Sequence, residues 1–88
     1  MHFQYDHAKA KSNYKKHGVS FADAEGIFYD PLALHPQDTG FREEERFVAI
    51  GMGSAGRIVV VVYTFRGEEI LLISACLATR RELKQYEK

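Results

Sequence analysis

Hydrophobic residues concentrate in the second half of the chain, whereas polar residues dominate its first twenty positions. The longest apolar run, Ile58 to Tyr63, is made of β-branched residues and a tyrosine, which favour strands. A second apolar run follows the short turn Arg66-Gly67-Glu68. Two such runs joined by a turn predict an antiparallel hairpin, formed by Arg57–Phe65 and Glu69–Cys76.

The hairpin does not alternate cleanly between apolar and polar positions. Ile58, Val60 and Val62 point to one face, and Val59, Val61 and Tyr63 point to the other. Both faces of the sheet are therefore apolar. Either the chain covers both faces itself, or part of one face is left for a partner protein.

The polar first segment carries the signals of a helix from His7 to His17. Asp6 can cap it, because a carboxylate accepts from the free N–H groups of the first turn. Lys15, Lys16 and His17 lie at the end where the helix dipole favours positive charge. Gly18 supplies a left-handed stop.

Two further helices are predicted from their caps. Ser20, with Asp23 three residues later, resembles a capping box and begins a helix that ends at Asp30-Pro31, since a residue before proline leaves the helical region. Thr79 and Glu82 form a second capping box, which begins a terminal helix ending near Tyr86.

The remaining segments complete a β-α-α-β-β-β-α order. They are a short strand at Met1–Tyr5, a loop at Leu32–Phe41, a strand at Glu44–Met52 and a turn at Gly53–Gly56. Strands joined by short turns predict an antiparallel meander, and helices on either side of it in sequence predict an α+β fold. We expect all the helices to pack on one side of the sheet.

Length and charge limit the possible functions. The 88 residues suit one domain, which buries roughly 60–65% of its unfolded surface and gains from a partner. The formal net charge is zero, which is mild evidence against strong RNA binding. The cations are nevertheless clustered early and late in the chain, at Lys9, Lys11, Lys15, Lys16, Arg80, Arg81, Lys84 and Lys88.

Several classes of site and location are not indicated. The histidines lack H-x-x-H spacing and Cys76 has no second cysteine, so no metal site is expected. No P-loop or dinucleotide fingerprint is present, so no cofactor is expected. A single cysteine, no signal peptide and no membrane-length apolar run are consistent with a reducing cytoplasm.

Spaced motif positions run along almost the whole chain. The opening stretch contributes Phe3, Tyr5, Asp6, Lys9, Asn13, Lys16-His17-Gly18, Val19, Ser20-Phe21, Ala24, Phe28 and Asp30-Pro31. The rest contributes Glu44-Glu45-Arg46, Gly51, Val61-Val62-Tyr63, Arg66, Ile73-Ser74-Ala75, Ala78-Thr79-Arg80-Arg81-Glu82 and Tyr86. Together these positions resemble the BrnT family, the toxin half of a bacterial toxin–antitoxin pair.

The resemblance implies a small ribonuclease toxin with a RelE-like fold. It also implies a BrnA-like antitoxin with a dimeric ribbon-helix-helix DNA-binding domain, hence a two-plus-two complex that reaches operator DNA through the antitoxin. The rival hypothesis is a catalytically weak module that binds the antitoxin and helps to repress its own operon.

Cleaving RNA without a metal needs a base for the 2′-hydroxyl proton, an acid for the leaving oxygen and cations for the phosphate. The catalytic candidates are Glu45, Arg46, Arg66, His17 and position 76. The RNA-binding candidates are Lys16, Arg80, Arg81 and Tyr86; Tyr63 and Tyr86 could also stack on a base. The resemblance favours Glu45, Arg46 and Arg66.

Each candidate also has a structural interpretation. Glu45 and Arg46 could be solvated charges at a strand entry, and Arg66 a turn residue. His17 could be a helix-end charge, and Tyr86 could pack the last helix onto the sheet. The pattern leaves these alternatives open.

Position 76 departs from the family pattern, in which Ile-Ser-Ala is followed by arginine. Cys76 cannot replace the forked donor set that suits phosphate. If that arginine contacts the scissile phosphate, its loss costs about 2–4 kcal/mol in the transition state. The chain could be a detoxified mutant, a natural variant that relies on Arg66, Arg80 or Arg81, or a degenerate member that only binds its antitoxin.

Overall fold

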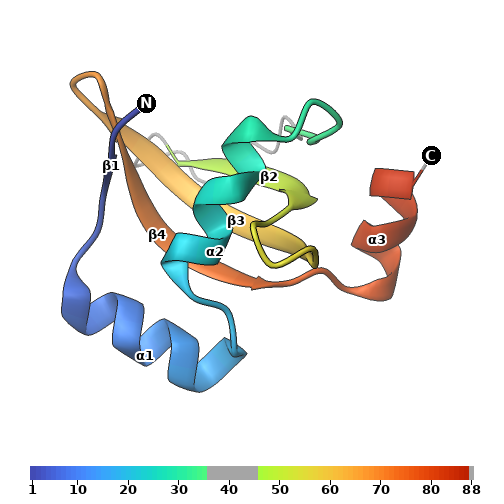
Figure 1. The fold of residues 1–88 in the computed structure, drawn as a ribbon, viewed down its shortest axis with the longest axis horizontal. Helices are drawn as coiled ribbons and strands as arrows, with labels where there is room; N and C mark the ends of the chain where they lie inside the picture. The colour runs from blue at the N-terminus through green and yellow to red at the C-terminus, as the bar shows by residue number, and fades with distance from the viewer. Residues whose placement is uncertain (36–45, 88) are drawn as a thin grey trace.

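The computed structural model describes residues 1–35 and 46–87, and it contains a mixed sheet flanked by helices (Figure 1). In chain order the elements are β1 (Phe3–Gln4), α1 (His7–His17), α2 (Phe21–Glu25), a 3-10 turn η1 (Gly26–Tyr29), β2 (Phe47–Met52), β3 (Ile58–Arg66), β4 (Glu69–Leu77) and α3 (Arg80–Glu87). The predicted α+β class and the predicted order of elements are confirmed.

The four strands lie in the order β1-β4-β3-β2. Strands β2, β3 and β4 form the predicted antiparallel meander, and the short β1 adds a parallel edge beside β4. The pairing of β3 with β4 shifts between Val62 and Tyr63, where Ser74 and Leu72 are their partners and Ile73 is the extra residue. Such a bulge increases the local twist of the hairpin.

The core lies between the sheet and the helices α1 and α2. Val59, Val61 and Tyr63 project into it from β3, where they meet the fully buried Phe21 and Ile27. On the opposite face, Val60 is also buried and Ile58 and Val62 are half-buried. The described part of that second face is therefore not a broad open apolar surface.

Local signals explain where the helices begin. The Asp6 carboxylate accepts from the N–H of Ala8 at 2.8 Å, and the Ser20 hydroxyl accepts from the N–H of Asp23 at 3.0 Å. Thr79 and Glu82 exchange two hydrogen bonds, which completes the predicted capping box. The three predicted caps are thus confirmed.

The second helix differs from its prediction, because it tightens from α to 3-10 geometry at Gly26. A Cβ at Gly26 would lie 2.5 Å from the backbone nitrogen of Ser54, so the helix approaches the β2–β3 turn backbone to backbone. This close contact fixes the helix against the turn and requires glycine there.

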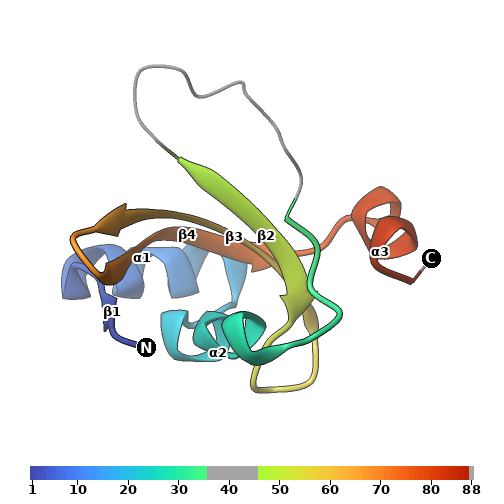
Figure 2. The ribbon, with the colours of Figure 1, turned by 90° about the horizontal axis from the view of Figure 1, so that it is seen from above.

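The third helix departs from the expectation that all helices share one side of the sheet. Helices α1 and α2 lie on one side, whereas α3 lies beyond the ends of the strands, near β2 (Figure 2). The Tyr86 hydroxyl donates to the Asp30 carboxylate at 2.6 Å and ties α3 to the segment after η1. Cys76 lies near the end of β4, shortly before α3 begins, so position 76 is also at this end of the sheet.

Candidate functional site

Strands β2 and β3 bring the two predicted catalytic arginines, Arg46 and Arg66, to one end of the sheet. Arg66 ends β3 opposite Glu69, and Arg46 directly precedes Phe47, the partner of Tyr63. The register separates Arg46 and Arg66 by about two residues along the strand direction, or about 7 Å. Arg66 is exposed, and Arg46 is half-buried with interactions of its own.

Glu45, the predicted general base, lies outside the described residues, as does Glu44. Arg46 is the described residue that directly follows them. The role of Glu45 therefore stays a prediction.

The other candidates lie at the opposite end of the sheet. Cys76 pairs with Val60, six residues before Arg66 on the same strand, which corresponds to a separation of about 20 Å. Arg80 and Arg81 are exposed on the first turn of α3. Position 76 and Arg66 therefore cannot hold the same phosphate.

Lys16 and His17 also belong to this second group. Both are exposed in the last turn of α1, next to Gly18. The Gly18 carbonyl accepts from Arg57, which directly precedes β3, at 3.2 Å. The end of α1 is thereby held at the same end of the sheet as Cys76, away from Arg46 and Arg66.

The Cys76 thiol is half-buried, and burial followed by the negative charge of Glu82 raises its pKa. The thiol therefore stays protonated at neutral pH, which makes it a poor nucleophile. The Tyr86 hydroxyl also makes a structural contact, because it donates to Asp30. This hydrogen bond raises the pKa of Tyr86, with smaller contributions from burial and from the charge of Asp30. Its predicted packing role is supported by this bond.

Four side chains at the hairpin end form a cluster, of which the sequence analysis named only Tyr63, as a ring that could stack on a base. We call it the aromatic end, and it consists of His35, Phe47, Tyr63 and Phe65. The three rings of Phe47, Tyr63 and Phe65 contact one another, with centroids 5.4 to 5.8 Å apart. Phe47 and Phe65 remain 40% and 55% exposed. The available signal was their adjacency to arginine, in Arg46-Phe47 and Phe65-Arg66.

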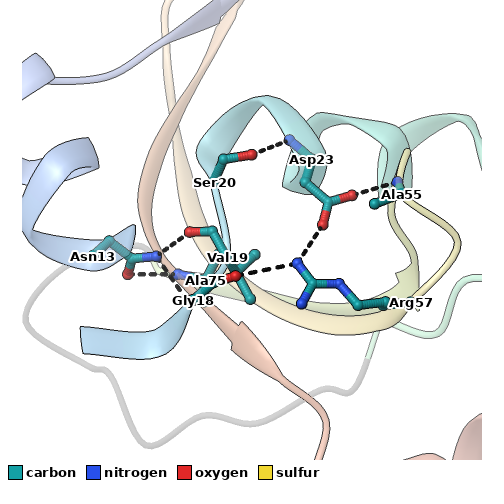
Figure 3. A network of polar contacts seen from close by, with 8 residues as sticks. All are labelled: Asn13, Gly18, Val19, Ser20, Asp23, Ala55, Arg57 and Ala75. Atoms are coloured by element: carbon teal, nitrogen blue, oxygen red, sulfur yellow. Dashed lines mark hydrogen bonds and ion pairs between the residues drawn. The ribbon is translucent and has the colours of Figure 1, made fainter. Parts of the chain in front are cut away.

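The opposite end is held by a buried hydrogen-bond network (Figure 3). We call it the polar end, and it consists of Asn13, Asp23, Arg57 and Ala75. The Asn13 amide donates to the carbonyls of Val19 and Ala75 at 3.0 and 2.8 Å and accepts from the N–H of Ala75 at 3.1 Å. It thus pairs with the edge of β4 as a neighbouring strand would.

Asp23 is the second centre of the polar end. Its carboxylate accepts from the N–H of Ala55 at 2.7 Å and pairs with Arg57 at 3.2 Å. Its backbone carbonyl accepts from the N–H of Ser54 at 3.0 Å. These contacts hold α2 to the β2–β3 turn, so their role is structural.

The part of the chain that the structure describes offers neither a cluster of metal ligands nor a helix long enough to cross a membrane. Among residues 1–35 and 46–87, no group of three or more His, Cys, Asp or Glu side chains could hold a metal ion. No helix among the described residues has the length and apolar character needed to span a bilayer.

Comparison with known proteins identifies the family. The model of the ribonuclease toxin BrnT of type II toxin–antitoxin systems matches residues 5–82. The crystal structure of the Brucella abortus ribonuclease toxin BrnT is similar, with a TM-score of 0.70 and 28% sequence identity over 91% of this chain and 99% of that chain. None of the curated proteins searched matches the chain. The chain therefore belongs to the BrnT family of ribonuclease toxins, which act in type II toxin–antitoxin systems and are paired with an antitoxin.

Proposed function

We propose that this chain is a single-domain cytoplasmic toxin that cleaves RNA without a metal ion, using Arg46 and Arg66 to stabilise the reacting phosphate. The observation that carries the proposal is their placement: two strands bring both residues to one end and one face of the sheet. In this mechanism Glu45 takes the 2′-hydroxyl proton, and the guanidinium groups stabilise the charge that develops on the phosphate oxygens.

Position 76 contributes to a different part of the RNA. Arg80 and Arg81 follow Cys76 in α3, and Lys16 and His17 lie at the same end of the sheet, so these side chains form a second group of cationic or titratable residues away from Arg66. A single strand that runs along the sheet can reach both groups. We propose that Cys76 weakens the hold on RNA in this second group, so that the chain is an attenuated toxin.

Cleavage of a defined RNA in the presence of EDTA tests both parts. At RNA concentrations below saturation, Cys76→Arg should cut faster than the chain as written, by about tenfold or more if the new guanidinium reaches a phosphate oxygen, because a contact far from the reacting phosphate adds binding. In the Cys76→Arg background, Arg66→Ala and Glu45→Ala should each reduce the rate about 10²-fold or more. Lys11→Ala, an exposed cation on α1, serves as the control and should leave the rate unchanged.

The outcomes separate the assignments. Equal rates for Cys76→Arg and the chain as written would show that position 76 is not a phosphate contact. Full activity in Arg66→Ala and Glu45→Ala would remove the proposed catalytic site at the hairpin end. Loss of cleavage in EDTA, restored by a divalent cation, would overturn the metal-independent mechanism.

A second candidate function is a catalytically weak module that binds its antitoxin and helps to repress its operon. Cys76 at the expected arginine position and the zero formal charge favour it. The proposed partner is a BrnA-like antitoxin with a ribbon-helix-helix domain, in a two-plus-two complex that binds operator DNA through the antitoxin. Size-exclusion chromatography of the co-expressed pair tests this, and separate elution at micromolar concentration would contradict it.

A further inference from the structure

The aromatic end has the composition and rigidity of a ligand site. Tyr63 is only 6% exposed and lies beneath the two exposed rings. Phe28 meets Tyr63 edge-on at 4.9 Å and an interplanar angle of 86°, which connects the exposed rings to the core. Phe47 and Phe65 are therefore held in place before any ligand arrives, so little conformational entropy is lost on binding.

The arrangement of the rings also leaves their faces available. Phe47 and Phe65 meet at an interplanar angle of 65°, which is an edge-to-face contact. Such a contact uses the edge of one ring and leaves ring faces free to stack on another π-system. Exposed rings of this kind offer more to a flat aromatic ligand than to an aliphatic side chain.

A hydrogen-bonding group lies beside the rings. The Tyr63 hydroxyl lies 3.4 Å from Nδ1 of His35. Burial raises the pKa of Tyr63, so its hydroxyl stays protonated and can donate to Nδ1. When Nδ1 accepts this bond, the N–H of the ring lies on Nε2. Because His35 is exposed, this N–H can donate to a ligand placed against the rings.

The cations nearest the rings in sequence belong to the other face of the sheet. Arg66 follows Phe65 and Arg46 precedes Phe47, and successive residues of a strand point to opposite faces. Arg66 is exposed, and the carboxylate of Glu69 opposite it accepts from the Gln4 side chain of β1. A nucleotide whose base lies on the rings can therefore reach Arg66 where its phosphate passes around the end of the hairpin.

We propose that the aromatic end binds one unpaired RNA base, which stacks on Phe47 and Phe65 while His35 donates a hydrogen bond to its edge. The phosphate attached to that nucleotide passes around the end of the hairpin to Arg66, on the other face of the sheet. Unpaired bases are recognised in this way, by stacking on aromatic side chains together with hydrogen bonds to base edges. The inference rests on the proposed RNA-cleaving function and adds to it the feature that selects a single-stranded substrate.

The test uses the full chain and a short single-stranded oligonucleotide with 2′-O-methyl groups, which removes the nucleophile and prevents cleavage. Fluorescence anisotropy measures its Kd against the parent, Phe47→Leu and Phe65→Leu. Each leucine keeps an apolar side chain but removes a ring face, and should weaken binding about tenfold. Tyr14→Leu, which alters a 60% exposed ring on α1, should leave Kd unchanged.

A second oligonucleotide with abasic nucleotides separates base stacking from phosphate binding. The parent should bind it about tenfold more weakly than the intact strand, whereas Phe65→Leu should bind the two strands almost equally. An unchanged melting temperature of Phe65→Leu establishes that the fold is retained. Equal Kd values for parent and Phe65→Leu with the intact strand would overturn the proposal.

The remaining outcomes distinguish this inference from the proposed function. If Arg66→Ala stops cleavage while Phe65→Leu leaves Kd unchanged, the catalytic proposal stands and the base site is wrong. If Cys76→Arg cuts no RNA while Phe65→Leu still weakens binding, the base site stands and the catalytic proposal is wrong. If Phe65→Leu weakens only antitoxin binding, the aromatic end is an antitoxin surface and the proposal is overturned.

Discussion

The two ends of the sheet are held together by different interactions. At the polar end, Asn13 and Asp23 are 7% and 6% exposed, and they join α1 and α2 to β4 and to the β2–β3 turn. At the aromatic end, the rings pack against one another instead, and the Tyr63 hydroxyl lies 3.4 Å from Nδ1 of His35. The polar end is held by directional, buried hydrogen bonds, whereas the aromatic end is apolar and half-exposed.

This difference indicates which end serves the fold and which is available for a ligand. Both N–H groups of the Asn13 amide have backbone acceptors, so the side chain has no spare donor for a ligand. Phe47 and Phe65 instead keep 40% and 55% of their surface exposed. Substitutions at the polar end should therefore change stability, and substitutions at the aromatic end should change function.

The largest effect is expected from Asn13→Leu. Leucine has a similar volume but cannot pair with Ala75 or donate to the carbonyl of Val19 in the loop before α2. It leaves the N–H of Ala75 and the carbonyls of Val19 and Ala75 buried without these partners. Each such group costs about 1–3 kcal/mol, and we expect a total loss of about 3–5 kcal/mol in the free energy of unfolding.

Urea unfolding measures this change. Ser12→Ala, at the neighbouring exposed position of α1, is the matched control and should change stability by less than about 0.5 kcal/mol. A loss in Asn13→Leu no greater than that of the control would show that the amide does not hold the edge of β4, and the contrast between the two ends would fail.

A smaller effect is expected at Asp23. Removing the carboxylate in Asp23→Ala leaves the N–H of Ala55 without its acceptor and should cost about 1–3 kcal/mol. Arg57→Ala should cost less, because the Arg57 side chain is 44% exposed and its ion pair is screened by water. A double-mutant cycle should give a coupling of about 0.5–1 kcal/mol. A coupling of zero would show that the ion pair of Asp23 and Arg57 contributes nothing to stability.

Much of the fold followed from local signals in the sequence. The hairpin and the three caps were predicted because turn residues and capping side chains act within a few positions of one another. The predicted hairpin also implied the separation of Arg66 from position 76, since a strand of nine residues spans about 30 Å. The family arginine at position 76 could therefore have been placed away from Arg66 before the structure was known.

The missed features all depend on contacts distant in sequence. Asn13 looked like one more polar residue in a polar helix, because its partner Ala75 is 62 positions away. The tightening of the second helix depends on the approach of Gly26 to Ser54. The aromatic end requires the register that sets Phe47 opposite Tyr63. Periodicity and capping patterns carry no information about such partners.

The smallest effect is a dependence of stability on pH that comes from Asp30. Partial burial of Asp30 acts to raise its pKa, but hydrogen bonds from Met52, Tyr86 and Leu32 outweigh it, and the pKa is lowered overall. A carboxyl whose pKa is lower in the folded state stabilises the fold above its unfolded pKa. That contribution is lost as the pH falls below about 4.

Tyr86 should give the opposite limb. Its hydrogen bond to Asp30 raises its pKa in the folded state, so its contribution is present below about pH 10 and is lost as the pH rises through the folded pKa. Tyr63, at the aromatic end, also has a raised pKa through burial and adds an alkaline limb of its own. Acid sensitivity of this origin should therefore come from Asp30 and not from the aromatic end.

Urea midpoints measured from about pH 3 to pH 5 for the parent, Asp30→Asn and Tyr63→Phe test this assignment. Subtracting each variant from the parent at every pH cancels the groups that they share, including Glu25, whose pKa burial raises. The advantage of the parent over Asp30→Asn should shrink as the pH falls below about 4, whereas its difference from Tyr63→Phe should stay constant across this range. If the difference between the parent and Asp30→Asn does not vary with pH, then the charge of Asp30 contributes nothing to folding. The bond from Tyr86 would then hold α3 no better to a carboxylate than to a neutral acceptor.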